Sequence, residues 1–509
     1  MSFARVLSAQ PALPNAHLVS VEADIARGLH AFTIVGLPDN AVKEARDRVS
    51  SAIKNSGLES PKAKNKKIVI SLGPADLKKE GALFDLPVAL SYLLAAEEIK
   101  FDPAGKIFIG ELALDGTVRS VRGALSAAML AKEKKYREIF VPEGNAEEAS
   151  LVSGISVYPV HSLSQILAHL RPKEPKPIKP FVRSNNVTAL SHENIVDLSE
   201  IRGQDSAKRA LEIAVAGGHN IAFYGPPGTG KTMLARAAAA LLPPLSEDEM
   251  LEVTAIHSLA GTLSGPAVIH PPFRSPHHTS SYPSLIGGGA NLKPGEVTLA
   301  HKGLLFLDEF PEFHRDVVNA LREPLEDARV SIARAKGSAT YPANFMLVAA
   351  LNPCPCGKYG TRECVCMPAA IEKYKRKISG PVADRIDMWV HVASLPLETL
   401  SQKNRKTSGE TETARRRIIS AREIQKNRFG AVKSLTTNAD MGAKDIEKHA
   451  HLSGKAEEVL LQAAKQLKLS ARGYHRTVKL ARTIADLAGS SSIEPAHMLE
   501  ALQYRAREF

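Results

Sequence analysis

The stretch GPPGTGKT at Gly225–Thr232 decides the fold of this chain, because it fits the pattern G-x-x-x-x-G-K-[ST] without a mismatch. The apolar run Asn220–Tyr224 precedes it, and the helical sequence Met233–Leu242 follows it. Between a buried strand and a helix, the backbone N–H groups of such a turn and the helix N-terminus form an anion site for phosphates. A glycine turn with a merely solvated lysine is the alternative, and the strand and helix argue against it.

Two further apolar runs end in polar groups. Gly303–Glu309 reads GLLFLDE, which is typical of a Walker B strand, so Asp308 is expected to hold the hydration shell of Mg²⁺ and Glu309 to orient and polarise the attacking water. Phe345–Leu351 is followed by Asn352, whose amide is placed to touch the γ-phosphate or the water, as in the sensor position of the AAA+ class. The two acids could instead cap the next helix, but such a cap would not need the phosphate loop. The three strands predict an ATPase.

The cofactors predicted from this pattern are ATP and Mg²⁺, with Lys231 reaching the β- and γ-phosphates and Thr232 and Asp308 serving the metal. The predicted nucleotide-binding residues are Gly225, Pro226, Pro227, Gly228, Thr229, Gly230, Lys231, Thr232 and Asp308.

Composition describes an ordinary globular protein. With 509 residues, 44% of them hydrophobic and 24% charged, the chain is long enough for about three domains. No stretch approaches the ~18 consecutive apolar residues of a membrane span, and the first residues lack a signal-peptide core. We therefore expect a cytoplasmic protein without a membrane partner. The net charge of +12 favours anionic partners such as nucleic acid, although most of these charges are expected to be solvated.

All four cysteines lie close together, as Cys354-Pro-Cys356 and Cys364-Val-Cys366. Four thiols in this arrangement suit a structural Zn²⁺ site that staples a loop, and a reducing compartment would keep them available. The spacing is C-x-C rather than the commoner C-x₂-C. Two disulfides are the alternative in a secreted protein, and no sequence feature indicates secretion.

Four regions follow from the pattern along the chain. Residues 1–170 alternate strand-like and helical runs, as an α/β or α+β domain does. Residues 171–194 begin with a proline- and lysine-rich stretch that predicts an extended linker, with a DNA-binding tail as its alternative. Residues 195–400 hold the nucleotide motifs, and residues 401–509 are expected to form an all-helical lid. The predicted fold class is thus α/β and multidomain.

A long insertion separates the first two nucleotide-binding strands and is a candidate for function because it exceeds ordinary loop lengths. It contains Phe273–Ser281, in which Arg274, His277 and His278 are guesses for contacts to phosphate or polynucleotide. An ordered packing loop is the alternative. Metal binding by the two histidines is the weaker interpretation, because neighbouring residues rarely converge on one ion.

Two arginines are candidates for catalysis. Arg385 follows the sensor strand, where it could reach the nucleotide of a neighbouring subunit. Arg472 opens a lid helix that could fold back on the γ-phosphate of its own subunit. The alternative for each is a surface ion pair, which would contribute little.

Together these motifs resemble the YifB/ComM family of magnesium-chelatase-like AAA+ proteins, along essentially the whole chain. The motifs that carry the resemblance are Gly225–Thr232, Phe273–Ser281, Gly303–Phe310, Leu321–Glu326, Asn352–Gly357 and Arg472–Leu487. It implies a Lon-protease-like, ribosomal-S5-like N-terminal domain, an AAA+ P-loop α/β core and a C-terminal helical lid. It also implies an ATP-driven hexameric ring, with Arg385 as the trans-acting arginine finger and Arg472 as the second sensor.

The function implied by this resemblance is that of a cytoplasmic DNA helicase that drives branch migration when transforming single-stranded DNA is integrated into the chromosome. Catalysis is then expected from Glu309, Lys231, Asn352, Arg385 and Arg472. The expected partners are single-stranded and branched DNA and further copies of the chain.

The N-terminal region departs from an active protease. Lon-like proteases need a nucleophilic serine and a lysine base. Lys79–Leu86 has no serine where the family's catalytic motif would place one, and Gly123–Ser126 lacks the lysine. We expect a proteolytically inactive domain used for DNA contact or ring assembly.

Two other functions remain open. An ATP-driven protein-remodelling chaperone would suit the linker and the inactive N-terminal domain. A metal-chelatase-type remodeller shares the ATPase core, but the chain has no region like the acidic and metal-binding parts of the partner subunit.

Overall fold

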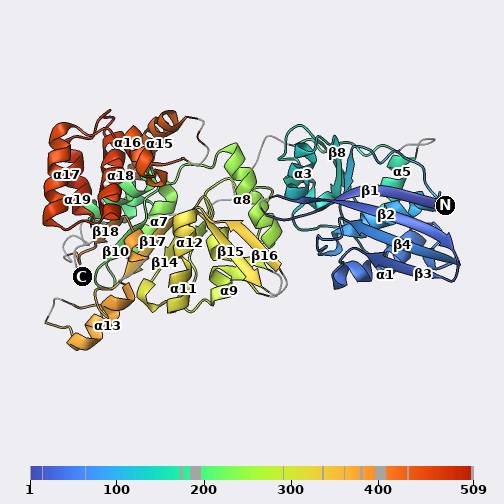
Figure 1. Ribbon diagram of the computed structural model, residues 1–509, viewed down its shortest axis with the longest axis horizontal. Coiled ribbons are helices and arrows are strands. Elements are labelled where there is room, and N and C mark those ends of the chain that lie inside the picture. The colour runs from blue at the N-terminus through green and yellow to red at the C-terminus, as the bar shows by residue number, and fades with distance from the viewer. Residues whose placement is uncertain are drawn as a thin grey trace. The chain divides into compact units, whose positions relative to one another are not determined.

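The computed structural model describes residues 2–13, 15–63, 65–171, 176–183, 196–289, 292–334, 337–359, 362–378, 382–395, 409–430, 432 and 435–505. Contacts divide the chain into two units, which are coloured by residue number in Figure 1. The first unit contains Met1–Ala189 and Ser246–Val268, and the second contains Leu190–Leu245 and Ile269–Phe509.

The first unit is built on a mixed sheet with the strand order β3-β4-β2-β1-β5-β8-β9. Antiparallel pairs join β1 to β2 and β2 to β4, and the remaining neighbours are parallel. The strands are β1 (Ser2–Gln10), β2 (His17–Arg27), β3 (Ala31–Val35), β4 (Lys66–Gly73), β5 (Lys106–Phe108), β8 (Glu138–Pro142) and β9 (Ser156–Val160), with β6 (Glu111–Leu112) and β7 (Val118–Arg119) as a separate small pair.

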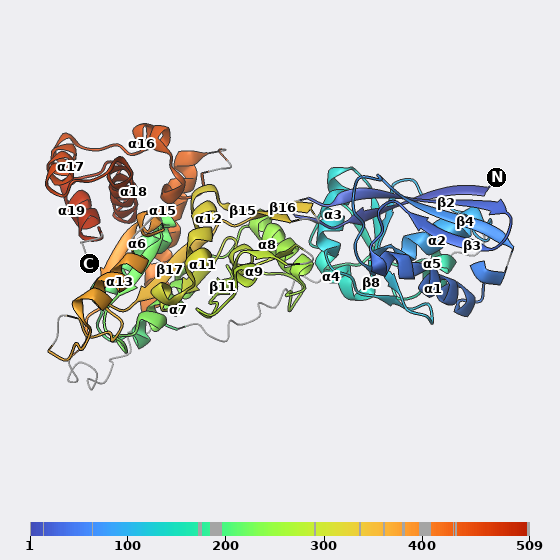
Figure 2. The same cartoon turned by 60° about the horizontal axis from the view of Figure 1, so that its bottom comes forward.

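Helices bury the apolar residues of this sheet. Along β4, Ile68, Ile70 and Leu72 are buried and alternate with less buried residues, which is the period-2 pattern of a half-buried strand. The helices described before residue 171 in this unit are α1 (Asn40–Asn55), α2 (Asp85–Ala95), α3 (Ala124–Glu133), α4 (Ala146–Ala149) and α5 (Leu163–Leu170). Helix α2 is buried along almost its whole length and contacts β1 and β2. Figure 2 shows α1 and α2 beside these strands.

A buried ion pair ties α1 to α2. The carboxylate of Asp85 is fully buried and accepts hydrogen bonds from Arg48 at 2.7 and 3.0 Å and from the Leu112 backbone N–H at 3.2 Å. Burial raises the pKa of Asp85 to about 6, although Arg48 and Leu112 act in the opposite direction. Leu83 and Phe84, just before Asp85, belong to the hydrophobic core. The segment Lys79–Leu86, which lacks the serine of Lon-like proteases, therefore contributes to packing in this chain.

Helix α8 (Glu247–Ala260) belongs to the first unit although it follows the phosphate loop in sequence. It contacts α3, and the Gly123 N–H donates to Ser258 Oγ at 3.0 Å. The Ser258 hydroxyl also donates to the buried carboxylate of Glu148 at 3.4 Å, and burial raises the pKa of Glu148. The contact-based division thus assigns Ser246–Val268 differently from the sequence-based region 195–400.

The predicted linker 171–194 lies partly outside the described residues, which omit 172–175 and 184–194. Its described part, 176–183, packs against the first unit. Ile178 is buried there, and the Phe181 N–H donates to the Val157 carbonyl at 2.7 Å.

The second unit is built on a parallel sheet with the strand order β11-β14-β17-β10-β18. Its strands are β10 (Ile221–Tyr224), β11 (Phe273–Arg274), β14 (Leu304–Leu307), β17 (Met346–Leu351) and β18 (Met388–His391). Nearly every residue of β10, β14 and β17 is buried, as expected for a parallel sheet that is covered on both faces. The runs predicted at Asn220–Tyr224, Gly303–Glu309 and Phe345–Leu351 are confirmed as strands.

Helices and short turns complete this α/β part. They are η4 (Leu198–Glu200), α6 (Asp205–Gly217), α7 (Lys231–Leu241), α9 (Tyr282–Leu285), α10 (Glu296–Leu299), η5 (Phe310–Glu312), α11 (Arg315–Ala320), α12 (Arg322–Asp327), α13 (Pro368–Ile378) and η6 (Ala383–Arg385). A hairpin of β15 (Arg329–Arg334) and β16 (Gly337–Pro342) precedes β17, and β12 (Gly287–Gly288) pairs with β13 (Lys293–Pro294). Sequence analysis did not predict either of these pairs.

The described residues from 409 to 505 are helical, as predicted. They form α15 (Glu410–Phe429), η7 (Asn438–Asp440), α16 (Ala443–His449), α17 (Gly454–Gln466), α18 (Ala471–Leu487) and α19 (Pro495–Gln503). Helices α17 and α18 both contact α19, and Figure 1 shows this group in red. Helix α15 contacts α6, where Lys208 pairs with Glu410 at 3.0 Å. The chain is therefore a mixed α/β protein of more than one unit, with a helical C-terminal region.

Candidate nucleotide-binding site

Three neighbouring strands of the second unit end at the predicted site. Strand β17 lies between β10 and β14 and is parallel to both. The residues that follow these strands therefore meet at one edge of the sheet, which is where ligands bind in open α/β sheets. Those residues are Gly225–Thr232, Asp308 with Glu309, and Asn352.

Lys231 lies at the centre of the loop. It is only 9% exposed, and its Nζ donates to the carbonyls of Gly225 at 2.8 Å and Pro226 at 2.7 Å. Burial lowers the pKa of Lys231. Gly228 and Gly230 have φ angles of +78° and +91°, which only glycine adopts without strain. The loop thus holds a cation beside the N-terminus of α7, where an anion is favoured.

Lys231 also meets the predicted sensor. Its Nζ donates to Asn352 Oδ1 at 3.2 Å, so the loop and the end of β17 share a hydrogen bond. Tyr374 on α13 is buried beside Asn352. Burial raises the pKa of its phenol above the usual range, and the Asn352 backbone acts in the opposite direction.

Thr232 and Asp308 form a pair of oxygen donors. The Thr232 hydroxyl donates to Asp308 Oδ2 at 2.9 Å, and Asp308 Oδ1 accepts from the Glu309 N–H at 2.9 Å. A hydroxyl and a carboxylate at this separation suit a hard divalent cation such as Mg²⁺, which binds proteins through oxygen. The donor set fits the predicted metal.

Glu309 has an unusual backbone and an unpredicted partner. Its φ angle is +50°, in the left-handed region that glutamate seldom adopts. Its carboxylate lies 3.1 Å from Nδ1 of His278, which belongs to the insertion after β11. His278 in turn stacks on His277, with ring centroids 4.2 Å apart. The structure thus brings one of the guessed insertion residues to the predicted water-polarising acid.

Arg274 has a different environment from the two histidines. Its guanidinium binds both carboxylate oxygens of Glu296, at 2.6 and 2.7 Å. The fork-to-fork geometry makes this a strong structural pair.

The two predicted catalytic arginines share one carboxylate. Arg385 donates to Glu326 Oε2, and Arg472 donates to Glu326 Oε1 at 3.1 Å. Arg385 is 7% exposed, whereas the Arg472 side chain is 62% exposed. Sequence analysis did not identify Glu326 as a functional residue. The only signal was the motif Leu321–Glu326, which was used for the family resemblance.

The four cysteines form a compact cluster in which every pair of Sγ atoms lies within 4.8 Å. The Sγ atom of Cys354 is 3.4 Å from that of Cys356 and 3.9 Å from that of Cys364, and all four thiols are free. Sulfurs at the corners of a zinc tetrahedron are about 3.8 Å apart when each lies ~2.3 Å from the metal. Hydrogen bonding by the Lys358 N–H, and then by Cys366 and the Val365 N–H, lowers the pKa of Cys356 to about 6. The donor set fits Zn²⁺.

The cysteine loop lies against the phosphate loop. Gly357 has a φ angle of +76°, and a Cβ atom at this position would lie 2.6 Å from Cδ of Pro227. Glycine is therefore required where the two loops touch. Helix α13 follows the cysteines in sequence, and its Tyr374 lies beside the Asn352 backbone.

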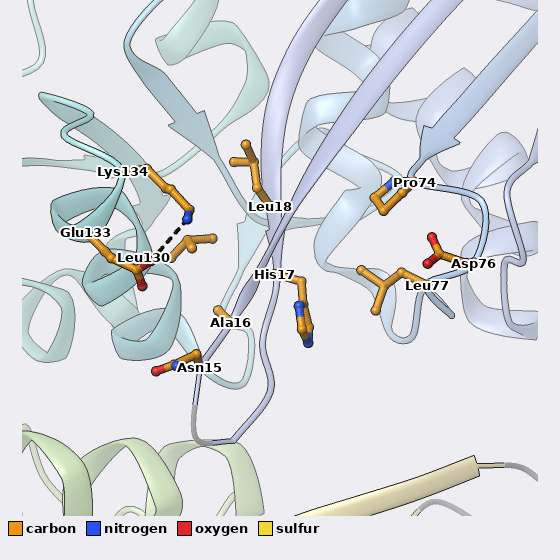
Figure 3. A pocket seen from close by; sticks show the side chains of 10 residues that line it. All are labelled: Asn15, Ala16, His17, Leu18, Pro74, Asp76, Leu77, Leu130, Glu133 and Lys134. Atoms are coloured by element: carbon orange, nitrogen blue, oxygen red, sulfur yellow. Dashed lines mark hydrogen bonds and ion pairs between the residues drawn. The ribbon is translucent and has the colours of Figure 1, made fainter.

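A pocket of about 550 Å³ lies in the first unit, between the start of β2 and the end of α3 (Figure 3). Its lining residues are Asn15, Ala16, His17, Leu18, Pro74, Asp76, Leu77, Leu130, Glu133 and Lys134. None of these described residues is a serine, threonine or cysteine, so the lining offers neither a hydroxyl nor a thiol nucleophile of these residue types.

Among the described helices, none combines the length and the apolar character of a membrane span.

Three family models match the chain. The model described as magnesium chelatase, subunit ChlI, matches residues 197–400, which include Gly225–Thr232, Asp308, Glu309 and Asn352. The model described as subunit ChlI of Mg-chelatase matches residues 21–145, and that of the ChlI C-terminal part matches residues 408–505. Together they cover most of the chain.

Curated relatives match from end to end. Competence protein ComM of Haemophilus influenzae is 42% identical over 509 residues, which cover 99% of this chain and 98% of that protein. An uncharacterised protein, YifB of Escherichia coli, is 42% identical over 498 residues, covering 97% of this chain and 95% of YifB. A shorter match, 32% identical over 157 residues, is to RuvB of Thermomicrobium roseum, a subunit of the Holliday junction branch migration complex. It covers 30% of this chain and 35% of RuvB.

Proposed function

Because this chain belongs to the YifB/ComM family of magnesium-chelatase-like AAA+ proteins, we propose that it is an ATP-driven motor that moves branch points in DNA. The hydrolytic part of this proposal depends on one observation. Lys231 contacts Asn352 while Thr232 contacts Asp308, so residues that follow three strands converge at one edge of the sheet.

ATP is the proposed substrate of this site. Gly225–Thr232 would surround the phosphates, with Lys231 on the β- and γ-phosphates. Mg²⁺ would be held by Thr232 and Asp308 and would supply charge neutralisation on the phosphate oxygens. Glu309 would orient the attacking water, and Asn352 would bind the water or the γ-phosphate.

Ring assembly is the second part of the proposal. AAA+ proteins commonly oligomerise, and we propose a hexamer in which Arg385 acts on the nucleotide of the neighbouring subunit. An arginine finger of this kind accelerates hydrolysis by about 10³–10⁵-fold. Arg472 would contribute a second positive charge to the γ-phosphate.

DNA is the proposed partner. The net charge of +12 and the sequence pI of about 9.3 favour a polyanion. The name of the Haemophilus relative refers to competence, and RuvB belongs to a branch migration complex. We therefore propose integration of transforming DNA by homologous recombination as the process, in the cytoplasm, with single-stranded and branched DNA as the substrates.

The remaining parts of the layout are proposals as well. We assign residues 1–170 to a Lon-protease-like, S5-domain-like fold without protease activity, residues 195–400 to the AAA+ core and residues 401–509 to the lid. We also propose that Cys354, Cys356, Cys364 and Cys366 bind a structural Zn²⁺, which the 3.4–3.9 Å sulfur separations among the first three favour.

The measurement that separates this proposal from a chaperone is the stimulation of ATPase activity. With the purified chain, phosphate release should rise when single-stranded or branched DNA is added and stay at the basal rate with an unfolded protein. Stimulation should decline steeply with salt, because phosphate contacts release counterions. Stimulation by unfolded protein alone would favour the protein-remodelling alternative.

A further inference from the structure

Glu326 joins two arginines that are distant from it in sequence. It lies on α12, and its partners Arg385 and Arg472 are 59 and 146 residues away, at η6 and in the first turn of α18. Each carboxylate oxygen accepts a hydrogen bond from one arginine. The nucleotide site described above gives no reason for this convergence.

The surroundings of Glu326 are strongly positive. Arg476, which lies one turn after Arg472 on α18, pairs with Asp387 at 3.3 Å. Burial lowers the pKa of Arg476, the carboxylates of Asp387 and Asp384 raise it, and the charges of Arg385 and Arg472 lower it. Helix α18 has no acidic residue in its first turn, so the positive end of the helix dipole adds to this field. Two guanidinium groups converge here because Glu326 offsets their repulsion.

The cluster is buried on one side and open on the other. Arg385 is 7% exposed, whereas the side chains of Glu326 and Arg472 are 50% and 62% exposed. An incoming anion can therefore approach from the solvent side, where Glu326 and Arg472 lie. The pKa of Glu326 is lowered, chiefly by the hydrogen bond from Arg385, so the carboxylate is a stable anion.

We infer that Glu326 is a positioning residue that holds Arg385 and Arg472 together as a pair, and that both arginines of this pair bind the γ-phosphate of the same nucleotide. The inference rests on the proposed ATPase function. Carboxylates and phosphates both offer neighbouring oxygens that accept paired hydrogen bonds from the N–H groups of guanidinium side chains. Arginines that converge on the two oxygens of one carboxylate are placed to share one phosphate.

This arrangement has a consequence for the ring. If Arg385 reaches the nucleotide of a neighbouring subunit, Arg472 reaches the same nucleotide. It then does not fold back on the nucleotide of its own subunit, as the sequence alone led us to expect. The lid of each subunit would thereby respond to the nucleotide bound by the neighbouring subunit.

A double-mutant cycle tests the role of Glu326. Glu326→Gln should lower kcat by about 10-fold or more with little change in KM for ATP, because the misaligned arginines mainly lose contact with transition-state charge. In an Arg472→Ala background, Glu326→Gln should cause a much smaller further loss of kcat, since one arginine of the pair is already missing. Glu326→Asp should recover part of the activity. Asp327→Asn, on the same exposed turn, is the matched control and should behave as the wild type.

Four results would contradict the inference: additive losses in the cycle, an unchanged kcat, a raised kcat, or a loss confined to KM. Unfolding curves and ring assembly of each variant distinguish misalignment from misfolding. A wild-type chain that releases no phosphate would instead remove the proposed function, and this inference with it.

Mixed rings test the shared phosphate. Subunits carrying both Arg385→Ala and Arg472→Ala are mixed with Lys231→Ala subunits, and phosphate release should recover, because an intact loop then meets two intact arginines. Recovery with the Arg385→Ala single variant but not with the double variant would show that Arg472 serves its own subunit, and would overturn the shared phosphate. Recovery with neither mixture would contradict the trans-acting arginine on which the proposed function depends.

Discussion

Glu309 is held in a left-handed backbone conformation, with φ of +50°, and its carboxylate contacts His278 at 3.1 Å. Conformations of this kind cost free energy and persist where the surrounding structure enforces them. Here the neighbours are Asp308, which accepts the Glu309 N–H, and the insertion that carries His278. The contact makes the insertion part of the proposed hydrolytic site.

Replacing Glu309 by glutamine should separate binding from hydrolysis. Glu309→Gln keeps the size of the side chain but removes the charge that polarises water, so phosphate release should fall by about 10²–10⁴-fold. The affinity for ATP should stay close to that of the wild type. His278→Ala should reduce turnover less, because it removes only a contact of Glu309, and His277→Ala is its control. Wild-type turnover in Glu309→Gln would exclude Glu309 as the carboxylate that activates water.

Asp85 gives a pH dependence to the stability of the first unit. Its pKa in the folded chain is about 6, above the ordinary value of 3.8. The folded state therefore binds the proton more tightly, and this stabilisation is complete below pH 3.8 and is lost as the pH rises through 6. The change amounts to roughly 3 kcal/mol, at 1.36 kcal/mol for each pKa unit.

Hydrogen exchange of the α2 amides in the full-length chain measures this change. Corrected for intrinsic rates, the free energy of opening should decrease between pH 4.5 and pH 7 in the wild type. In Asp85→Asn, which cannot titrate, this decrease should be missing. An equal decrease in both proteins would contradict the raised pKa.

Single residues could be placed by sequence only where the motif is local. Lys231, Thr232, Asp308 and Asn352 follow predictable strands, and the parallel order of those strands brings them together. The partners His278 and Glu326 could not be predicted, because their contacts depend on how distant elements pack rather than on spacing along the chain.

Elements with strong local patterns were predicted and others were not. Strands such as β4 and helices such as α2 account for the alternating runs predicted within residues 1–170, because β4 is buried on one face and α2 on almost all sides. The hairpin β15–β16 escaped prediction, and most residues of β15 are exposed. Helix α8 has a clear capping box at Ser246 and Glu249, but its assignment to the first unit depends on tertiary contacts with α3.

The cysteine loop is the element most directly joined to the nucleotide site. It abuts Pro227 at Gly357, and Tyr374 of the following helix α13 lies beside the Asn352 backbone. A metal that fixes the four thiols would therefore also fix the sensor residue. Loss of the metal should therefore lower ATPase activity without unfolding the chain globally.

Metal analysis of the purified chain should find about one zinc per subunit, held by four thiolates. A strong chelator should remove it and lower phosphate release, and added Zn²⁺ should restore both. Cys356→Ser should bind zinc more weakly and lose activity in parallel, while the unfolding of the first unit should not change. Protein that is fully active without any bound metal, or that contains two disulfides, would contradict this assignment.

At the scale of the whole molecule, the chain combines a parallel-sheet ATPase unit, a mixed-sheet first unit and a helical region that carries Arg472. Each function proposed for the assembly depends on a charge placed by a separate element: Lys231 on α7, Arg385 on η6 and Arg472 on α18. In the proposed ring, Arg385 of one subunit would complete the site of the next. Hydrolysis and movement would then be coupled between subunits.

The most direct test of this motor is a branch-migration assay on a synthetic three-strand or four-strand junction with ATP and Mg²⁺. The wild type should move the branch point and release labelled strand, whereas Lys231→Ala should bind the same junction and leave it in place. A wild-type chain that hydrolyses ATP on the junction but never displaces the branch would contradict the central claim.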